Sequence, residues 1–129
     1  MSPFANMGSH LKKKYGAAYV NIGFVFGEGS FQAIGMSDQS GLKEWTLGPA
    51  PEIDVSTAFS RTGKDLLALD LRTLPKGAVR DWFSSPHPMR ETGAVFSTEA
   101  NMSQPMTLTK RFDAVIFIAK TTRARPVKN

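Results

Sequence analysis

Apolar residues near the amino terminus recur at the spacing of a helix. Phe4, Met7 and Leu11 would share one face of it. Three consecutive lysines then precede Gly16, and cations in a last turn followed by glycine are typical of a helix end. The pattern predicts a helix over residues 3–15.

Four longer apolar segments have the character of strands. Residues 17–26 are largely apolar on both alternating faces, which is typical of a strand inside a sheet covered on both sides. Gly27-Glu28-Gly29 follows, and its two glycines favour a turn that leads residues 30–36 back as a hairpin partner. We expect further buried strands over residues 65–71 and 112–119, the second of them central in its sheet because it is the most continuous apolar run.

Shorter elements complete the pattern. Asp54 is suited to cap a helix over residues 55–62, and residues 43–47 are typical of a short strand. Residues 97–110 are polar enough to predict a long loop. Together these elements predict an α/β fold, a mixed β-sheet flanked by helices. We expect one domain or fragment over residues 1–129, with a basic flexible tail over 121–129.

Composition excludes several classes of protein. The 129 residues include no cysteine, so disulfide scaffolds, thiol nucleophiles and cysteine-based metal sites are excluded. No apolar run approaches the roughly 20 residues of a membrane span, and no basic start leads into an apolar signal segment. We therefore expect a cytoplasmic protein without a membrane association.

Spacing identifies no complete catalytic or cofactor site. His10 and His87 lie far apart and show no zinc spacing, so a helix surface and a rigid loop are their simpler roles. Gln32 stands where a dinucleotide motif needs its third glycine. Ser37 begins like a nucleophile elbow, but the following glycine of that turn is missing, which favours a plain loop residue. We predict no catalytic residue, no metal and no cofactor from these residues.

Five charged residues remain as candidates for binding or for structural ion pairs. Asp70 and Arg72 lie two apart on a predicted strand and so project from one face, where they could reach a cleft or form a structural ion pair. Arg90 and Glu91 could likewise reach a cleft or form a structural ion pair. Glu28 lies in the glycine turn, which is either structural or directed at a substrate.

Several segments, in order, resemble the C-terminal part of the erythromycin esterase family, which includes proteins labelled as succinoglycan-biosynthesis proteins. The resemblance spans nearly the whole chain. It is carried by Met7-Gly8-Ser9-His10-Leu11, Tyr15-Gly16, Tyr19-Val20-Asn21-Ile22-Gly23-Phe24, Phe26-Gly27-Glu28-Gly29-Ser30-Phe31, Leu47-Gly48-Pro49-Ala50, Leu69-Asp70-Leu71-Arg72, Pro88-Met89-Arg90, Gly93-Ala94-Val95, Arg111-Phe112-Asp113-Ala114, Ile116-Phe117 and Thr121-Thr122.

The resemblance implies a metal-independent hydrolase in which a histidine activates water against a macrolide lactone ester, an activity linked to antibiotic resistance. In that family the catalytic histidine and its acidic partners lie in the N-terminal part, and a His-Asn-x-His segment precedes the helix that opens this chain. Neither segment occurs here, so we expect a C-terminal portion that is inactive alone. Within the intact fold, Glu28, Arg72 and Arg90 are the predicted substrate-binding residues, and the ligand is a small ester or lactone.

The net charge of +5 leaves a different class open, a small basic module that binds nucleic acid or an acidic partner. Basic and aromatic residues do not alternate, which argues against nucleic acid. A third expectation is self-association, because an isolated part of a sheet exposes strand edges and apolar faces.

Overall fold

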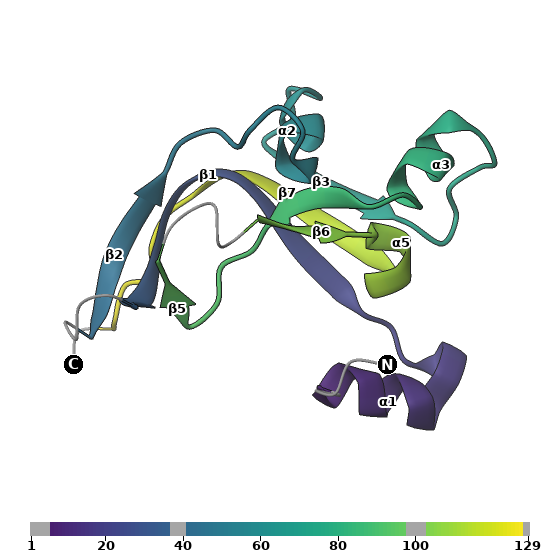
Figure 1. Cartoon of the computed structure of the whole chain (residues 1–129), viewed down its shortest axis with the longest axis horizontal. Coiled ribbons are helices and arrows are strands. Elements are labelled where there is room, and N and C mark those ends of the chain that lie inside the picture. The colour runs from purple at the N-terminus through teal and green to yellow at the C-terminus, as the bar shows by residue number, and fades with distance from the viewer. Residues whose placement is uncertain (1–5, 37–40, 98–102, 128–129) are drawn as a thin grey trace.

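The computed structural model describes residues 6–36, 41–97 and 103–127. Its main sheet has strand order β2-β1-β7-β3, with the short β5 paired to the end of β1 (Figure 1). A second, two-stranded sheet joins β4 and β6. The strands are β1 Ile22–Gly35, β2 Leu42–Leu47, β3 Leu66–Asp70, β4 His87–Arg90, β5 Val95–Phe96, β6 Ser103–Met106 and β7 Ala114–Thr121, and the helices are α1 Met7–Tyr15, η1 Gly16–Ala18, α2 Val55–Ser60, α3 Ala78–Phe83 and α5 Leu108–Arg111. The mixed α/β fold is as predicted.

The middle of the main sheet is a parallel pair of strands. β7 runs parallel to β1, with Ile22 opposite Ala114, and antiparallel to β3 on its other side. The prediction that the apolar run near residues 112–119 forms a central strand is confirmed. The sequence predicted a buried strand over residues 65–71. In the structure this strand, β3, lies at the edge of the sheet instead.

The prediction of a turn at Gly27-Glu28-Gly29 is wrong. β1 continues through all three residues, pairs first with β7 and then, from Gly29 onward, with β2. The glycines serve the close approach of β7 instead. A Cβ on Gly27 would lie 2.5 Å from the carbonyl oxygen of Ala119, and one on Gly29 (φ 131°) would collide with the backbone of Thr121. The hairpin partner of β1 is therefore β2, and residues 30–35 belong to β1 itself.

Other boundaries also differ from the predictions. The strand expected over residues 17–26 begins only at Ile22, because residues 16–18 form a 3₁₀ turn. Asn6 caps α1 by accepting the Ser9 amide, while residues 1–5 lie outside the described part. The predicted loop over residues 97–110 contains β6 and the start of α5. Pairing with β4 gives that polar stretch its partner, a long-range contact that local composition cannot reveal.

The larger of two buried apolar clusters lies on one side of the main sheet, and the smaller one joins Ala33 to Phe96. Val25, Val115 and Phe117 point to that side from β1 and β7, and α2 packs over them with Val55 and Phe59. Asp54 caps α2 as predicted: its carboxylate accepts the Ser56 amide at 2.8 Å. Figure 1 shows α2 above this side of the sheet, and α1, none of whose residues is buried, well apart from it.

Candidate functional site

The side of the sheet turned away from α2 is apolar, and it is exposed around Ile22, Phe24, Leu66 and Ala68, while Phe26 and the β7 side chains on the same side are partly buried. We call it the open face. Successive side chains of a strand alternate between the two faces of its sheet. The pairing register aligns the side chains on one face of β1, β7 and β3 in rows across the sheet. The open face consists of Ile22, Phe24 and Phe26 of β1, Ala114, Ile116 and Ile118 of β7, and Leu66 and Ala68 of β3. Phe24 is 65% exposed and Leu66 69% exposed.

Glu28, one predicted binding residue, bounds the open face at one end. It continues the row of Phe24 and Phe26, and it lies opposite Lys120 of β7. The Glu28 carboxylate and the Lys120 ammonium are 3.6 Å apart, and the lysine is mostly exposed. A solvated pair of this kind contributes little to stability, so both groups could engage a ligand at low cost.

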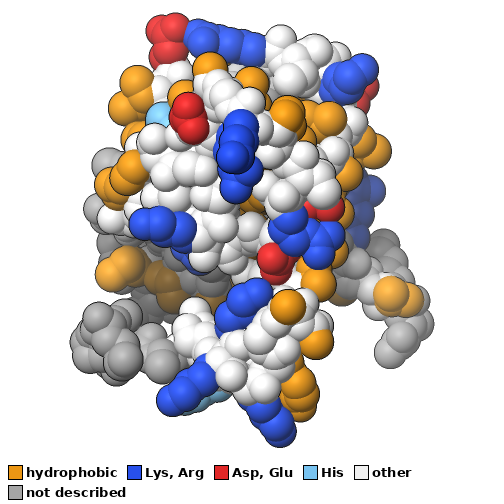
Figure 2. All heavy atoms as spheres, turned by 90° about the vertical axis from the view of Figure 1, so that its right-hand side faces the viewer, with side chains coloured by type: hydrophobic (Ala, Val, Ile, Leu, Met, Phe, Trp, Pro, Cys, Tyr) orange, Lys and Arg blue, Asp and Glu red, His pale blue; other side chains and the backbone are white. Residues whose placement is uncertain are grey.

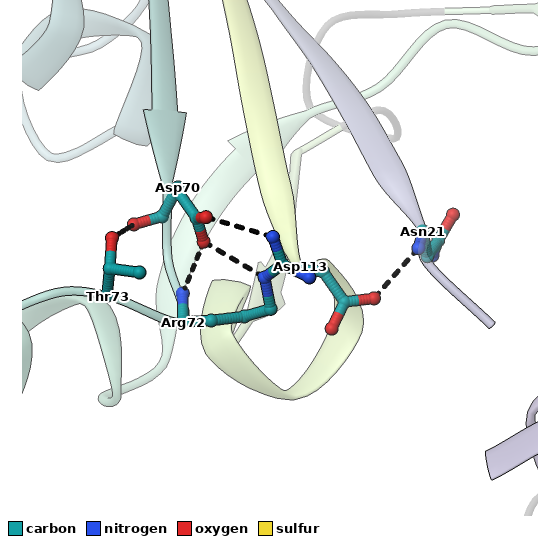
Figure 3. Close-up of polar contacts among 5 residues, drawn as sticks. All are labelled: Asn21, Asp70, Arg72, Thr73 and Asp113. Atoms are coloured by element: carbon teal, nitrogen blue, oxygen red, sulfur yellow. Dashed lines mark hydrogen bonds and ion pairs between the residues drawn. The ribbon is translucent and has the colours of Figure 1, made fainter. Parts of the chain in front are cut away.

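Asp70 and Arg72 bound the open face at its other end (Figure 3). Arg72 donates from Nε and Nη2 to the two carboxylate oxygens of Asp70, at 3.1 and 2.9 Å, and its backbone amide donates to the same carboxylate. These hydrogen bonds lower the pKa of Asp70 below its ordinary value, and the side-chain bond from Arg72 is the largest cause. The same pairing raises the pKa of Arg72. The ion pair favoured from the sequence is present, and both partners remain partly exposed.

Next to this pair, the Asp113 carboxylate accepts the backbone amide of Asn21 at 2.8 Å. Figure 3 shows the two carboxylates close together at the ends of the strands, with the Arg72 guanidinium between them. Asp113 joins the start of β7 to the segment that leads into β1. Its carboxylate is thus engaged in holding the parallel pair of strands together.

Arg90, the third predicted binding residue, is buried inside the fold. Only 1% of it is exposed, and its Nη1 donates to the carbonyl oxygens of Gly27 and Gly48, both at 2.8 Å. Its guanidinium also lies 5.5 Å from the centre of the Phe26 ring. Glu91 does not pair with it, because Glu91 forms an ion pair with Arg111 at 2.9 Å. Arg90 therefore connects β1 to the segment after β2.

The structure does not bring all three predicted binding residues, Glu28, Arg72 and Arg90, into one place. A hollow of about 600 Å³ adjoins the open face, and its lining includes Phe24, Phe26, Phe31, Arg90 and Thr121. Glu28 lies in β1 between lining residues of this hollow, whereas Arg72 lies near the opposite end of β7. Lys120 lies six positions after Ala114 in β7, and at 3.3 Å per position this corresponds to about 20 Å. Glu28 and Arg72 thus flank one apolar surface and do not share one pocket.

Neither histidine meets a carboxylate within the described residues. His87 lies in β4, not on the predicted loop. Its Nε2 donates to the Trp82 carbonyl oxygen at 2.8 Å, and its ring stacks on the Trp82 indole with 3.9 Å between ring centres. His10 is exposed on α1, as the sequence predicted. Ser37 lies outside the described residues.

In the part of the chain that the structure describes, no three side chains of the metal-binding types gather into a possible site. Among the same residues, no helix is long and apolar enough to cross a bilayer. Figure 2 shows Lys and Arg side chains spread over the visible face with Asp and Glu among them. That distribution provides no single basic patch on this face.

Phe24 and Asp113 were not among the predicted site residues. A signal for Phe24 was present in the sequence, because residues 22–26 are apolar on both alternating faces. That pattern predicts a strand whose two faces are both covered, and it does not show which face the structure leaves exposed. For Asp113 no local signal exists, because its partner Asn21 lies 92 residues away.

A parallel pair of strands at the centre of a mixed sheet, with α2 packed on one face, defines a mixed α/β fold. Comparison with known families identifies the family. The erythromycin esterase family model matches residues 1–121, and the chain belongs to that family. The resemblance inferred from the sequence is confirmed.

Two solved structures share the fold. A succinoglycan biosynthesis protein is 23% identical, with a TM-score of 0.78 over 92% of this chain. A protein from Bacillus cereus is 25% identical, with a TM-score of 0.78 over 89% of this chain. The chain spans only 28% of the length of each of them. No curated protein matches the chain.

Proposed function

We propose that this chain serves carboxylic ester hydrolysis, with a macrolide lactone as the substrate class, as the sheet-bearing C-terminal portion of an erythromycin-esterase-like hydrolase. The observation that carries the proposal is the match of the family model to residues 1–121. The chain's share of 28% in the two solved structures supports a role as one part of a longer catalyst.

In this role the chain provides one wall of the substrate cleft. The hollow beside the open face is lined by aromatic side chains, among them Phe24 and Phe31, and by hydroxyl groups such as that of Thr121. A volume of about 600 Å³ is within the range of ligand sites, which are mostly apolar with a few polar groups that fix orientation. A macrolide presents large apolar faces together with hydroxyl groups, which suits such a wall.

Activation of water falls to residues outside this chain. Ester hydrolysis requires a positioned base for the water and donors for the developing oxyanion. Among the described residues, His87 is bound to a backbone carbonyl and His10 has no carboxylate partner to orient it. We therefore propose that the chain alone does not open a lactone ring.

A chimaera tests the proposal. The chain replaces the segment of an active erythromycin esterase that the family model aligns with residues 1–121. Ring-opened macrolide is then measured by mass spectrometry for the chimaera and for the chain alone. We expect product from the chimaera only. Turnover by the chain alone, or a folded chimaera without activity, would contradict the proposal.

The predicted binding residues are tested in the same chimaera. Glu28→Gln removes a charge at the end of the open face that adjoins the hollow, and we expect KM to rise by about 3–10-fold, the loss of one exposed charged contact. Arg72→Gln removes a charge at the far end of the open face, about 20 Å away, and we expect a smaller rise in KM. Arg61→Gln is the matched control, because Arg61 is also exposed and ion-paired but belongs to the end of α2. An equal rise in KM for the control would assign the effect to general charge.

A further inference from the structure

The two faces of the main sheet carry side chains of the same kind. On the side of α2, Val25 and Phe117 are buried by the chain itself. On the open face, the corresponding rows contain Phe24 opposite Ile116 and Phe26 opposite Ile118. A sheet face that meets water is expected to be polar at these positions. None of the eight side chains of the open face carries a charge.

The strand pairing shows what kind of cover is missing. β1 and β7 are parallel, and parallel strands occur in α/β proteins with helices packed on both faces. α2 supplies a helix on one face only. The open face ends at the Glu28–Lys120 pair on one side and at the Asp70–Arg72 pair on the other. An apolar centre with a charged rim is the usual composition of a protein interface.

The solved structures indicate where this cover comes from. This chain retains its fold over 92% of its length while it accounts for 28% of the succinoglycan biosynthesis protein. Nearly three-quarters of that protein therefore lies outside the matched part and is available to cover a surface of this fold. The face under α2 is largely covered by the chain itself, apart from an apolar hollow between α2 and α3. The open face is a second apolar surface, and no described helix packs on it.

We infer that the open face, centred on Phe24, Ile116 and Leu66, is the docking surface for the helical remainder of an erythromycin-esterase-like fold. The inference rests on the proposed function for the identity of that partner. The docked polypeptide buries the apolar rows and encloses the adjoining hollow from its open side. Glu28 and Arg72 then lie at the two ends of the interface.

Thiol labelling tests this inference directly, because the chain contains no cysteine. Phe24→Cys places one thiol in the centre of the open face. Ile53→Cys is the control, since Ile53 is also apolar and 69% exposed but precedes α2. Each variant is labelled with a maleimide in the chain alone and in the chimaera, and the modified peptide is quantified by mass spectrometry.

In the chain alone we expect both positions to react at rates within about twofold of each other. In the chimaera we expect the reaction at position 24 to slow by at least about tenfold, because a buried thiol reacts only after local opening, while position 53 is unchanged. Since a chimaera can misfold, the labelling is repeated after co-expression of the chain with the remainder of the esterase as a separate polypeptide.

Protection at position 24 alone, in either arrangement, supports the inference. Equal labelling at position 24 with and without the esterase remainder, in both arrangements, overturns it. Concentration-dependent protection in the chain alone identifies a second copy as the occupant and also overturns it. Ester hydrolysis is not the readout, so an inactive but protected chimaera refutes the proposed function and leaves the docking surface standing.

Discussion

Two phenylalanines on neighbouring strands show how differently the two faces of this sheet are used. Phe117 of β7 is fully buried and stacks on Phe59 of α2, with 5.5 Å between ring centres. Phe24 of β1 is 65% exposed and has no described helix over it. Both occupy apolar rows of the same parallel pair. The comparison teaches that an apolar pattern along a strand does not tell which of its faces the chain's own helices cover.

The largest effect is expected from Phe117→Ala on the covered face. Removing the ring deletes a side chain in full contact with Phe59 and leaves a cavity in the core. We expect the free energy of unfolding to fall by about 3–5 kcal/mol. Urea unfolding followed by circular dichroism measures this. A loss near zero would show that α2 does not form the cover that distinguishes this face.

A smaller but clear loss in the free energy of unfolding is expected from Gly29→Ala. The new methyl group would meet the backbone of Thr121, and the φ angle of 131° is one that alanine rarely adopts. We expect a destabilisation of more than about 1 kcal/mol. Gly41→Ala separates the two causes, because Gly41 also has a positive φ but open space around it. An equal loss in both variants, again from urea unfolding, would attribute the effect to backbone strain alone.

On the open face, Phe24→Ala should change the stability of the isolated chain by no more than about 0.5 kcal/mol, as is usual for an exposed position. Self-association should decrease, because the variant removes apolar surface from the patch. Sedimentation velocity at rising concentration measures the second effect. If Phe24→Ala is as destabilising as Phe117→Ala, the open face is already covered within this chain and the comparison fails.

The smallest effect concerns the rim of the open face. The pKa of Asp70 is lowered by its bonds to Arg72, so the folded chain holds this carboxylate ionised to lower pH than the unfolded chain does. Its contribution to stability is present above the unfolded value and is lost as the pH falls through the lowered pKa. Asp70→Asn should therefore be slightly less stable at pH 7. The difference should close as the pH falls below the ordinary value of 3.8. A difference independent of pH contradicts this assignment, and thermal melts between pH 2 and 7, in steps of about one unit, measure it.

Local signals predicted much of the fold. The helical spacing before Gly16, the cap at Asp54 and the apolar run of β7 each depend on neighbouring residues, and the structure contains all three elements. The glycines at 27 and 29 misled for a physical reason. Glycine permits a turn and also permits close approach of another strand, and only the distant β7 decides between them.

The candidate site could be predicted less well. The ion pair of Asp70 with Arg72 follows from a separation of two residues, and the sequence indicated it. Arg90 shows the limit: it donates to backbone carbonyl groups 63 and 42 residues away, which no side-chain pattern predicts. The spacing of Glu28 and Arg72 across one face follows only from the register of β1, β7 and β3.

The parallel pairing of β1 with β7 also has a consequence for how the chain acquires its fold. Ile22 and Ala114 are strand neighbours at a sequence separation of 92 positions, so the central ladder closes only after all the polypeptide between them is available. Such non-local pairing is slow to form. During synthesis β1 therefore leaves the ribosome well before its partner, and its apolar rows need protection from aggregation until β7 arrives.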